Sequence, residues 1–270
     1  SIQFQQDMKG YYGAHAESLD FSSPKTLDRI NGWCNSKTNG LIPRILNKVN
    51  PEAESYLLNA IYFKAAWANP FEECYTETGT FTTGNGPEKM PLMQQWEEYR
   101  YMKNKVFAAV DLPYGNKKWS MTVLLPKKGK SVSDVIDYLA KEGTSFLSHM
   151  THRNIDLKMP RFETESTTED LIGTLEKMGI IRVFDGPQAE IRNMCNRDVF
   201  ISNMLQKAHI KVNENGSEAA AVTEVEVFFL STSDEEPVPP IIFHADHPFV
   251  YFIREASSDV ILFVGKFTGM

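Results

Sequence analysis

The chain has 270 residues, of which 42% are hydrophobic and 23% charged, and its 28 Lys and Arg against 35 Asp and Glu leave a net charge of −7. This length suits one large domain or two small ones. The acidic balance argues against a general nucleic-acid binder, and no apolar stretch reaches the roughly 18 residues that a membrane span needs. Three cysteines are an odd and sparse set, which excludes a disulfide framework.

The first predicted element is a helix with Ser23 as its cap and Pro24 in its first turn. Ile30 and Cys34 fall on its apolar face, and Asn39-Gly40 ends it. Residues 56–63 (YLLNAIYF) then form a near-continuous apolar run, which is typical of a strand buried on both faces.

Later runs of β-branched and aromatic residues predict more strands than helices. Helical spacing recurs in residues 132–139 and 171–178, and the second of these helices ends at Gly179. The order of elements does not alternate regularly, which favours an α+β domain built on large sheets. The further predicted strands are Val106–Leu112, Met121–Leu125, Ile155–Met159, Phe249–Ile253 and Val260–Val264.

Motifs of catalysis and cofactor binding are missing from the sequence. It holds no G-x-S-x-G elbow, no P-loop and no H-E-x-x-H pair. His244 and His247 flank Asp246, but no activated nucleophile is marked near them, and Cys34 lies on an apolar helix face. We therefore predict no enzyme, no catalytic residues, no cofactor and no metal site.

Residues 213–247 combine the pattern of a strand with that of an exposed loop. From Ser217 the side chains alternate, and the polar run 231–236 and the proline-rich run 237–240 follow. Phe228, Phe229 and Leu230 would be a liability on a surface unless a partner binds them; the alternative is an ordinary edge strand followed by a surface loop. One face carries Ser217, Ala219, Ala221, Thr223, Val225 and Val227, and the other carries Glu218, Ala220, Val222, Glu224, Glu226 and Phe228.

Several blocks of the sequence resemble the serpins, a family of serine protease inhibitors. The segment 214–221 (ENGSEAAA) resembles the hinge of their reactive-centre loop, and 243–249 (FHADHPF) resembles the family signature beyond that loop. The blocks 30–33, 59–67, 90–93, 157–162 and 263–266 match in the same order. The positions that we take as structural signature are Asn59, Trp67, His209, His247, Pro248 and Phe249.

This resemblance implies the serpin fold, with large mixed β-sheets, surrounding helices and an exposed, insertable reactive-centre loop. We expect one serpin domain over residues 1–270, with the hinge and loop at 214–240. The family's front helices and one strand of its central sheet have no counterpart before Ser1, so we expect the chain to be the C-terminal portion of the pattern.

The resemblance also implies the mechanism of a suicide inhibitor. A protease cuts the loop and forms an acyl-enzyme, and the cut loop then inserts as a new strand of the central sheet. The hinge fits this role, because its inserting face holds only small and β-branched side chains and no charge. The residues that we assign to the hinge and to insertion are Glu214, Gly216, Ser217, Glu218, Ala219, Ala220, Ala221, Thr223, Val225 and Val227.

The family spacing, counted from the hinge, places the cleaved bond between Leu230 and Ser231, with Phe228 and Phe229 beside it. Counting back from Pro248 places it near Pro237, which is a poor scissile residue. Leu230 suits chymotrypsin-like, elastase-like or subtilisin-like targets, and Asp234 would suit an aspartate-specific protease. Lys and Arg are absent between Asn213 and Arg254, which disfavours trypsin-like targets.

The predicted partner is thus an endopeptidase of the serine or the cysteine class, and we expect a monomer that binds no nucleic acid and spans no membrane. Two alternatives stay open, namely a non-inhibitory serpin that carries a ligand or acts as a chaperone, and an interaction fragment. Asn215-Gly216-Ser217 is the only glycosylation sequon, and it lies in the hinge. We therefore expect an unglycosylated protein, outside a bacterial cell or in its envelope, or in a cytosol.

Overall fold

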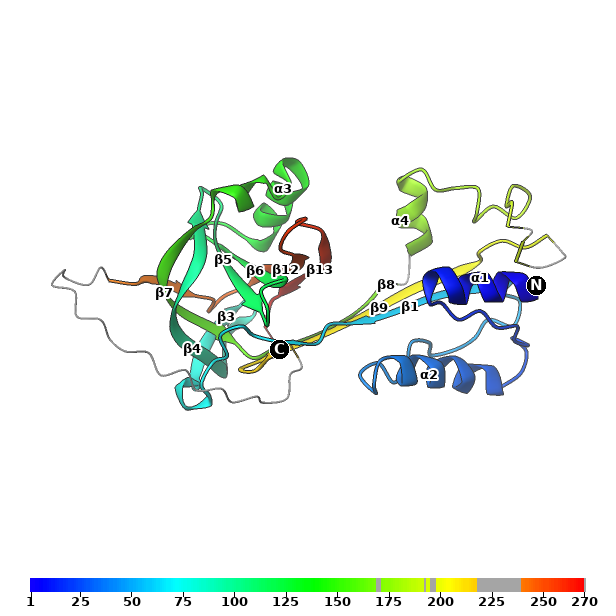
Figure 1. The fold of residues 1–270 in the computed structure, drawn as a ribbon, viewed down its shortest axis with the longest axis horizontal. Coiled ribbons are helices and arrows are strands. Elements are labelled where there is room, and N and C mark those ends of the chain that lie inside the picture. Colours follow the sequence, from blue (N-terminus) through cyan, green and yellow to red (C-terminus); the bar gives the residue numbers. More distant parts are fainter. Residues whose placement is uncertain (169–170, 192, 195–197, 218–238, 270) are drawn as a thin grey trace. The chain divides into compact units, whose positions relative to one another are not determined.

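The computed structural model describes residues 1–168, 171–191, 193–194, 198–217 and 239–269. The chain divides into two compact units (Figure 1). Unit 1 comprises Ser1–Tyr62 and Glu165–His209, and unit 2 comprises Phe63–Thr164 and Ile210–Met270. The single domain over residues 1–270 stays a prediction.

The described residues of unit 1 contain three helices, α1 (Ile2–Tyr12), α2 (Lys25–Lys37) and α4 (Leu171–Lys177). The predicted helix α2 is confirmed, and Ile30 and Cys34 are buried on its inner face. The helix begins at Lys25 with Pro24 at the cap position, one residue after the predicted cap Ser23, whose hydroxyl accepts a long hydrogen bond of 3.4 Å from the amide of Lys25. The other two predicted helices are confirmed as well, as α3 (Val132–Glu142) in unit 2 and as α4.

Strand β1 (Tyr56–Tyr62) pairs in parallel with β9 (Asn203–Asn213), in a register that runs from Tyr56↔Asn203 to Tyr62↔His209. The prediction that this strand is buried on both faces is wrong for the described residues. Tyr56, Leu58 and Ala60 pack on the core around α2, whereas Leu57 on the opposite face is 42% exposed. The physical reason is that the core around α2 covers one face of the strand.

Over its described residues, unit 2 is built on an eight-stranded sheet with the order β11-β7-β4-β5-β6-β12-β13 and with β3 beside β4. All five predicted later strands are confirmed in it; two begin one residue later than predicted, one begins where predicted, and the remaining ends extend by one to four residues. The bounds are β3 (Glu77–Thr83), β4 (Gly86–Lys103), β5 (Phe107–Tyr114), β6 (Trp119–Pro126), β7 (Thr151–Pro160), β11 (Ile241–His244), β12 (Phe249–Glu255) and β13 (Ile261–Phe267).

A smaller group of elements completes the fold. They are β2 (Ala65–Ala66), β8 (Phe162–Thr168), β10 (Gly216–Ser217) and the 3₁₀ helices at Glu73–Tyr75 and Ser145–His149. Helix α3 packs against β6 and β12. In the part of the chain that the structure describes, mixed sheets with four helices confirm the predicted α+β class. Among the described residues, no helix has both the length and the apolar character that would let it cross a membrane.

Candidate functional site

The base of the predicted loop is a short strand, β10, which is held between two others. Gly216 and Ser217 pair antiparallel with Asn213 and Val212 of β9 on one side, and with β2 on the other. The chain therefore turns back on itself directly after β9. The remaining predicted hinge and bait residues lie outside the described residues, and they are Glu218, Ala219, Ala220, Ala221, Thr223, Val225, Val227, Phe228, Phe229, Leu230 and Ser231.

Gly216 occupies a position that no other residue fits. Its φ is +140°, in a region that L side chains rarely adopt. A Cβ atom there would lie 2.2 Å from the carbonyl oxygen of Ala65 and 2.7 Å from the Cα of Ala66. The close approach of β10 to β2 thus requires glycine, which has no side chain, at position 216.

Glu214 is a buried carboxylate with two polar partners from distant parts of the chain. Its side chain is 3% exposed, and the Nε of Arg161 donates to both carboxylate oxygens, at 2.6 and 2.8 Å. The hydroxyl of Thr76 donates a further hydrogen bond at 2.5 Å. The backbone is fixed as well, because the amide of Phe71 donates to the carbonyl of Glu214 at 2.9 Å. These contacts hold the turn that precedes β10.

Ser217 is fully buried, and its hydroxyl lies 2.7 Å from the hydroxyl of Tyr114. Burial raises the pKa of Tyr114 well above its usual value, which keeps the phenol neutral and able to hydrogen-bond. The Tyr114 ring stacks on Trp67 at 4.3 Å, and the indole Nε1 of Trp67 donates to the carbonyl of Asn213 at 2.9 Å. A chain of aromatic and polar contacts therefore links Ser217 to the end of β9.

The predicted signature residues are divided between the two units. Trp67 belongs to the loop base described above, whereas Asn59 on β1 and His209 on β9 lie in unit 1. His247 donates from Nε2 to the carbonyl of Pro126 at 2.9 Å. Pro248 is half-buried, and Phe249 is fully buried in the core of unit 2.

The sequence did not indicate Arg161, Thr76 or Tyr114 as partners of the hinge. They lie 53, 138 and 103 residues away from the groups that they contact. Arg161 belongs to the block 157–162 that resembles the family, but the resemblance implied no role for it. The burial of Glu214, which calls for a cationic partner, is visible only in the structure, so the sequence carried no signal for these partners.

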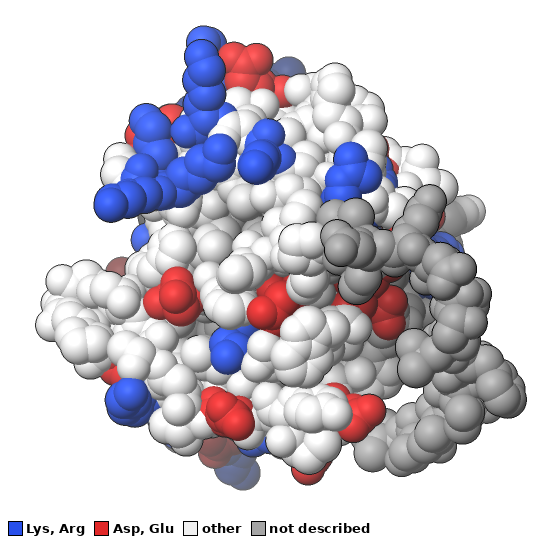
Figure 2. All heavy atoms as spheres, turned by 90° about the vertical axis from the view of Figure 1, so that its left-hand side faces the viewer, with Lys and Arg blue, Asp and Glu red and all other residues white. Residues whose placement is uncertain are grey.

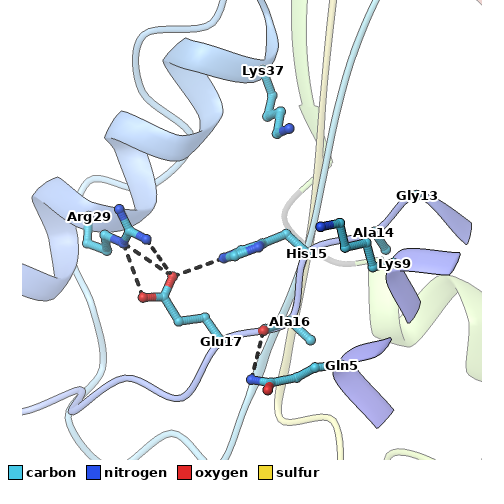
Figure 3. Close-up of a pocket in the computed structure, with 9 residues that line it drawn as sticks. All are labelled: Gln5, Lys9, Gly13, Ala14, His15, Ala16, Glu17, Arg29 and Lys37. Carbon is cyan, nitrogen blue, oxygen red and sulfur yellow. Dashed lines mark hydrogen bonds and ion pairs between the residues drawn. The ribbon is translucent and has the colours of Figure 1, made fainter. Parts of the chain in front are cut away.

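An open pocket of about 610 Å³ lies in unit 1 and contains none of the predicted site residues (Figure 3). Glu17 lies at its wall, where the carboxylate accepts hydrogen bonds from Arg29 and contacts His15. These hydrogen bonds lower the pKa of Glu17, and the hydrogen bond with His15 has the largest effect. No group of three or more residues that could hold a metal ion occurs in the part of the chain that the structure describes.

Comparison with known proteins identifies the family. The family model described as "Serpin (serine protease inhibitor)" matches residues 1–269. An uncharacterized serpin-like protein of Thermococcus kodakarensis is 34% identical over 96% of this chain and 60% of its own length. Serpin B10 of Bos taurus is 33% identical over 98% of this chain and 68% of its own length. The chain belongs to the serpin family.

Solved structures agree with this assignment. The native state of the thermophilic serpin tengpin matches with a TM-score of 0.84 and 28% identity, over all of this chain and 69% of that one. Human thyroxine-binding globulin in complex with its ligand matches with a TM-score of 0.86 and 28% identity, over all of this chain and 71% of that one. The predicted serpin fold is thereby confirmed, and the chain spans about two thirds of the length of the relatives it matches.

Proposed function

We propose that the protein to which this chain belongs inhibits endopeptidases by trapping the acyl-enzyme while its cleaved loop inserts into a sheet. Membership of a family described as serine protease inhibitors supports a function as an inhibitor rather than as an enzyme. The observation that carries the proposal is the alternation from Ser217 to Val227, with small or β-branched residues on one face. This segment begins in the described strand β10, which already pairs with β9.

The parallel pair of β1 and β9 offers a place for the inserted strand. The two strands are direct neighbours over seven residue pairs, from Tyr56↔Asn203 to Tyr62↔His209. A segment that turns back after β9 would run antiparallel to both strands, and insertion would replace one parallel ladder by two antiparallel ones. About a dozen residues of new ladder, at roughly 1 kcal/mol per hydrogen bond, give on the order of 10 kcal/mol. This is comparable to the stability of a whole domain.

The proposed cleaved bond is Leu230-Ser231, which lies outside the described residues. Leucine before the bond, preceded by two phenylalanines, fits a protease with an apolar primary pocket. We therefore propose serine endopeptidases of chymotrypsin-like, elastase-like or subtilisin-like specificity as targets, with cysteine endopeptidases as a second class. A monomer suffices for this reaction.

The mechanism is tested by two aspartate variants of neighbouring alanines, made in the complete protein. Ala219 belongs to the face that must enter the sheet, and aspartate there would bury an unpaired carboxylate at a cost of several kcal/mol. Insertion competes with hydrolysis of the acyl-enzyme, and about 1.4 kcal/mol changes a rate tenfold. Ala219→Asp should therefore be cut at the same bond but form little stable complex with chymotrypsin.

Ala220→Asp is the matched control, because its carboxylate stays on the opposite face, near water. It should retain most of the covalent complex, measured as the high-mass band on a denaturing gel. Equal loss of complex in both variants would show that the inserted strand uses another alternation. A wild-type protein that forms no complex with any protease of a broad panel would refute the inhibitor itself.

The similarity to thyroxine-binding globulin favours a ligand carrier as the second candidate. A carrier needs no insertion, so its loop would be cut without a covalent complex. The absence of a charged or bulky residue on the inserting face argues against it. The same gel separates the two candidates.

A further inference from the structure

The strand β11, which follows the predicted loop, is held to its sheet by few contacts. Among the described strands it pairs with β7 alone, over four residue pairs. Phe243 is buried in the core of unit 2, whereas Ile242 is 70% exposed. Pro239 and Pro240 are exposed and lead directly into β11. Because proline restricts its own backbone, these two residues transmit a shift of β11 to the loop.

A bridge of three side chains ties β11 to β7 and β4. The Oδ1 of Asp156 on β7 accepts a hydrogen bond from the Nε2 of Gln94 on β4 at 2.8 Å. The Oδ2 of Asp156 lies 3.2 Å from the Nε2 of His244, the last residue of β11. Since an ionised carboxylate only accepts hydrogen bonds, this Nε2 carries the proton. We call Gln94, Asp156 and His244 the bridge.

The charged groups around the bridge are few. Lys158 of β7 lies directly opposite His244, and β4 presents the uncharged Gln94 opposite Lys158. The titratable groups that follow β11, at 246 and 247, contact each other at 2.8 Å. Figure 2 views the side on which Figure 1 places β7, and in the middle of this face the charged side chains lie singly among uncharged ones. Asp156 is therefore the acidic partner of His244 within the described residues.

We propose that Asp156 is a positioning residue for the inhibition of the target protease. Through the bridge it fixes β11, and thereby the point at which the loop rejoins the sheet. A loop that is anchored at this end has fewer conformations to lose when the protease binds, so complex formation is faster. This inference rests on the proposed function, but it concerns the step before insertion. The share of acyl-enzyme that is trapped does not depend on Asp156, because the hinge and the inserting face are separate from the bridge.

Asp156→Asn in the complete protein tests the proposal. The second-order rate constant of complex formation with chymotrypsin should fall about fivefold, because the charged acceptor is lost. The ratio of covalent complex to cleaved product should remain that of wild type, whereas Ala219→Asp should change this ratio. A reduced ratio with an unchanged rate constant would overturn the proposal.

The pH dependence distinguishes positioning by the bridge from a general structural effect. Histidine gains its charge as the pH falls from about 8 to about 5.5, and the hydrogen bond to Asp156 then becomes charge-assisted. Lys158, opposite His244, limits this gain. The rate constant of Asp156→Asn, divided by that of wild type at the same pH, should therefore decrease toward low pH. In a His244→Gln background, which keeps a donor but does not titrate, the effect of Asp156→Asn should be independent of pH, and an unchanged pH dependence there would overturn the role of His244.

Glu98→Gln is the matched control. Glu98 of β4 contacts His152 of β7 at 3.1 Å, but the two side chains are 60% and 65% exposed, against 17% and 30% for Asp156 and His244. Neither residue of this pair lies on β11, and the rate constant of Glu98→Gln should stay within about twofold of wild type. An equal loss in Glu98→Gln and Asp156→Asn would overturn the proposal.

Hydrogen exchange measures the anchoring of β11 without a protease. The amide of Ala245 donates to the carbonyl of Lys158 at 2.7 Å, and its protection should fall about fivefold in Asp156→Asn and remain unchanged in Glu98→Gln. Unchanged protection in Asp156→Asn would overturn the proposal. If protection falls but the wild-type protein traps no protease, the proposed inhibitor is refuted, while the anchoring of β11 by Asp156 is upheld.

Discussion

At the scale of single residues, Gly216 is the position of the loop base at which we expect a substitution to be most destabilising. Gly216→Ala would place a methyl group 2.2 Å from a backbone oxygen at a φ of +140°. We expect β10 to separate from β2 and the free energy of unfolding to fall by about 2 kcal/mol or more. Gly84→Ala is the control, because nothing lies within 4 Å of its Cβ position. Urea denaturation of both variants checks this, and equal midpoints would contradict it.

At the same scale, we predict that Leu230 determines which proteases are inhibited. Leu230→Arg should abolish inhibition of chymotrypsin-like and elastase-like enzymes and create inhibition of trypsin-like ones, because the primary pocket of the protease binds this side chain. Second-order rate constants of inhibition against one protease of each class measure the change. An unchanged profile would mean that another bond is cut, and the segment 231–235 would be searched next.

At the scale of elements, Arg161 joins the connection between β7 and β8 to the turn between β9 and β10. Arg161→Ala would leave the buried carboxylate of Glu214 with Thr76 as its remaining side-chain donor among the described contacts. The free energy of unfolding should fall by roughly 2 kcal/mol. Adding Glu214→Gln should recover part of this loss, because the unpaired charge is then removed.

A surface ion pair of equal length provides the control. Arg182 contacts Glu190 at 2.6 Å, but both side chains are largely exposed, at 67% and 74%. Arg182→Ala should therefore change the free energy of unfolding by less than about 0.5 kcal/mol. If Arg161→Ala proves as mild as this variant, the connection does not stabilise the loop base.

At the scale of the whole molecule, the proposed insertion of the loop bears on whether Asn215 is glycosylated, and so on where the protein is synthesised. Asn215 is half-buried in the turn before β10, and its carbonyl accepts from the amide of Trp67 at 3.0 Å. A glycan at this point of the hinge could not enter a sheet. We therefore predict an unmodified Asn215, and synthesis outside a glycosylating secretory pathway. Mass spectrometry of active inhibitor from its natural source checks this, and a sugar on Asn215 would contradict it.

The sequence by itself determined the family and about half of the helices and strands. Apolar runs and helical spacing are local patterns, so they located α2, α3 and five strands of unit 2 without knowledge of their neighbours. The alternation after Ser217 likewise followed from residue types alone. What failed was the burial of β1, because exposure depends on the elements that cover a strand and not on its own composition.

Only the tertiary structure decided which distant residues meet. Glu214 finds Arg161 and Thr76, and Ser217 finds Tyr114, through strand pairings that join segments more than 50 residues apart. Such contacts depend on the register and order of strands in a sheet, which no local pattern of one strand specifies.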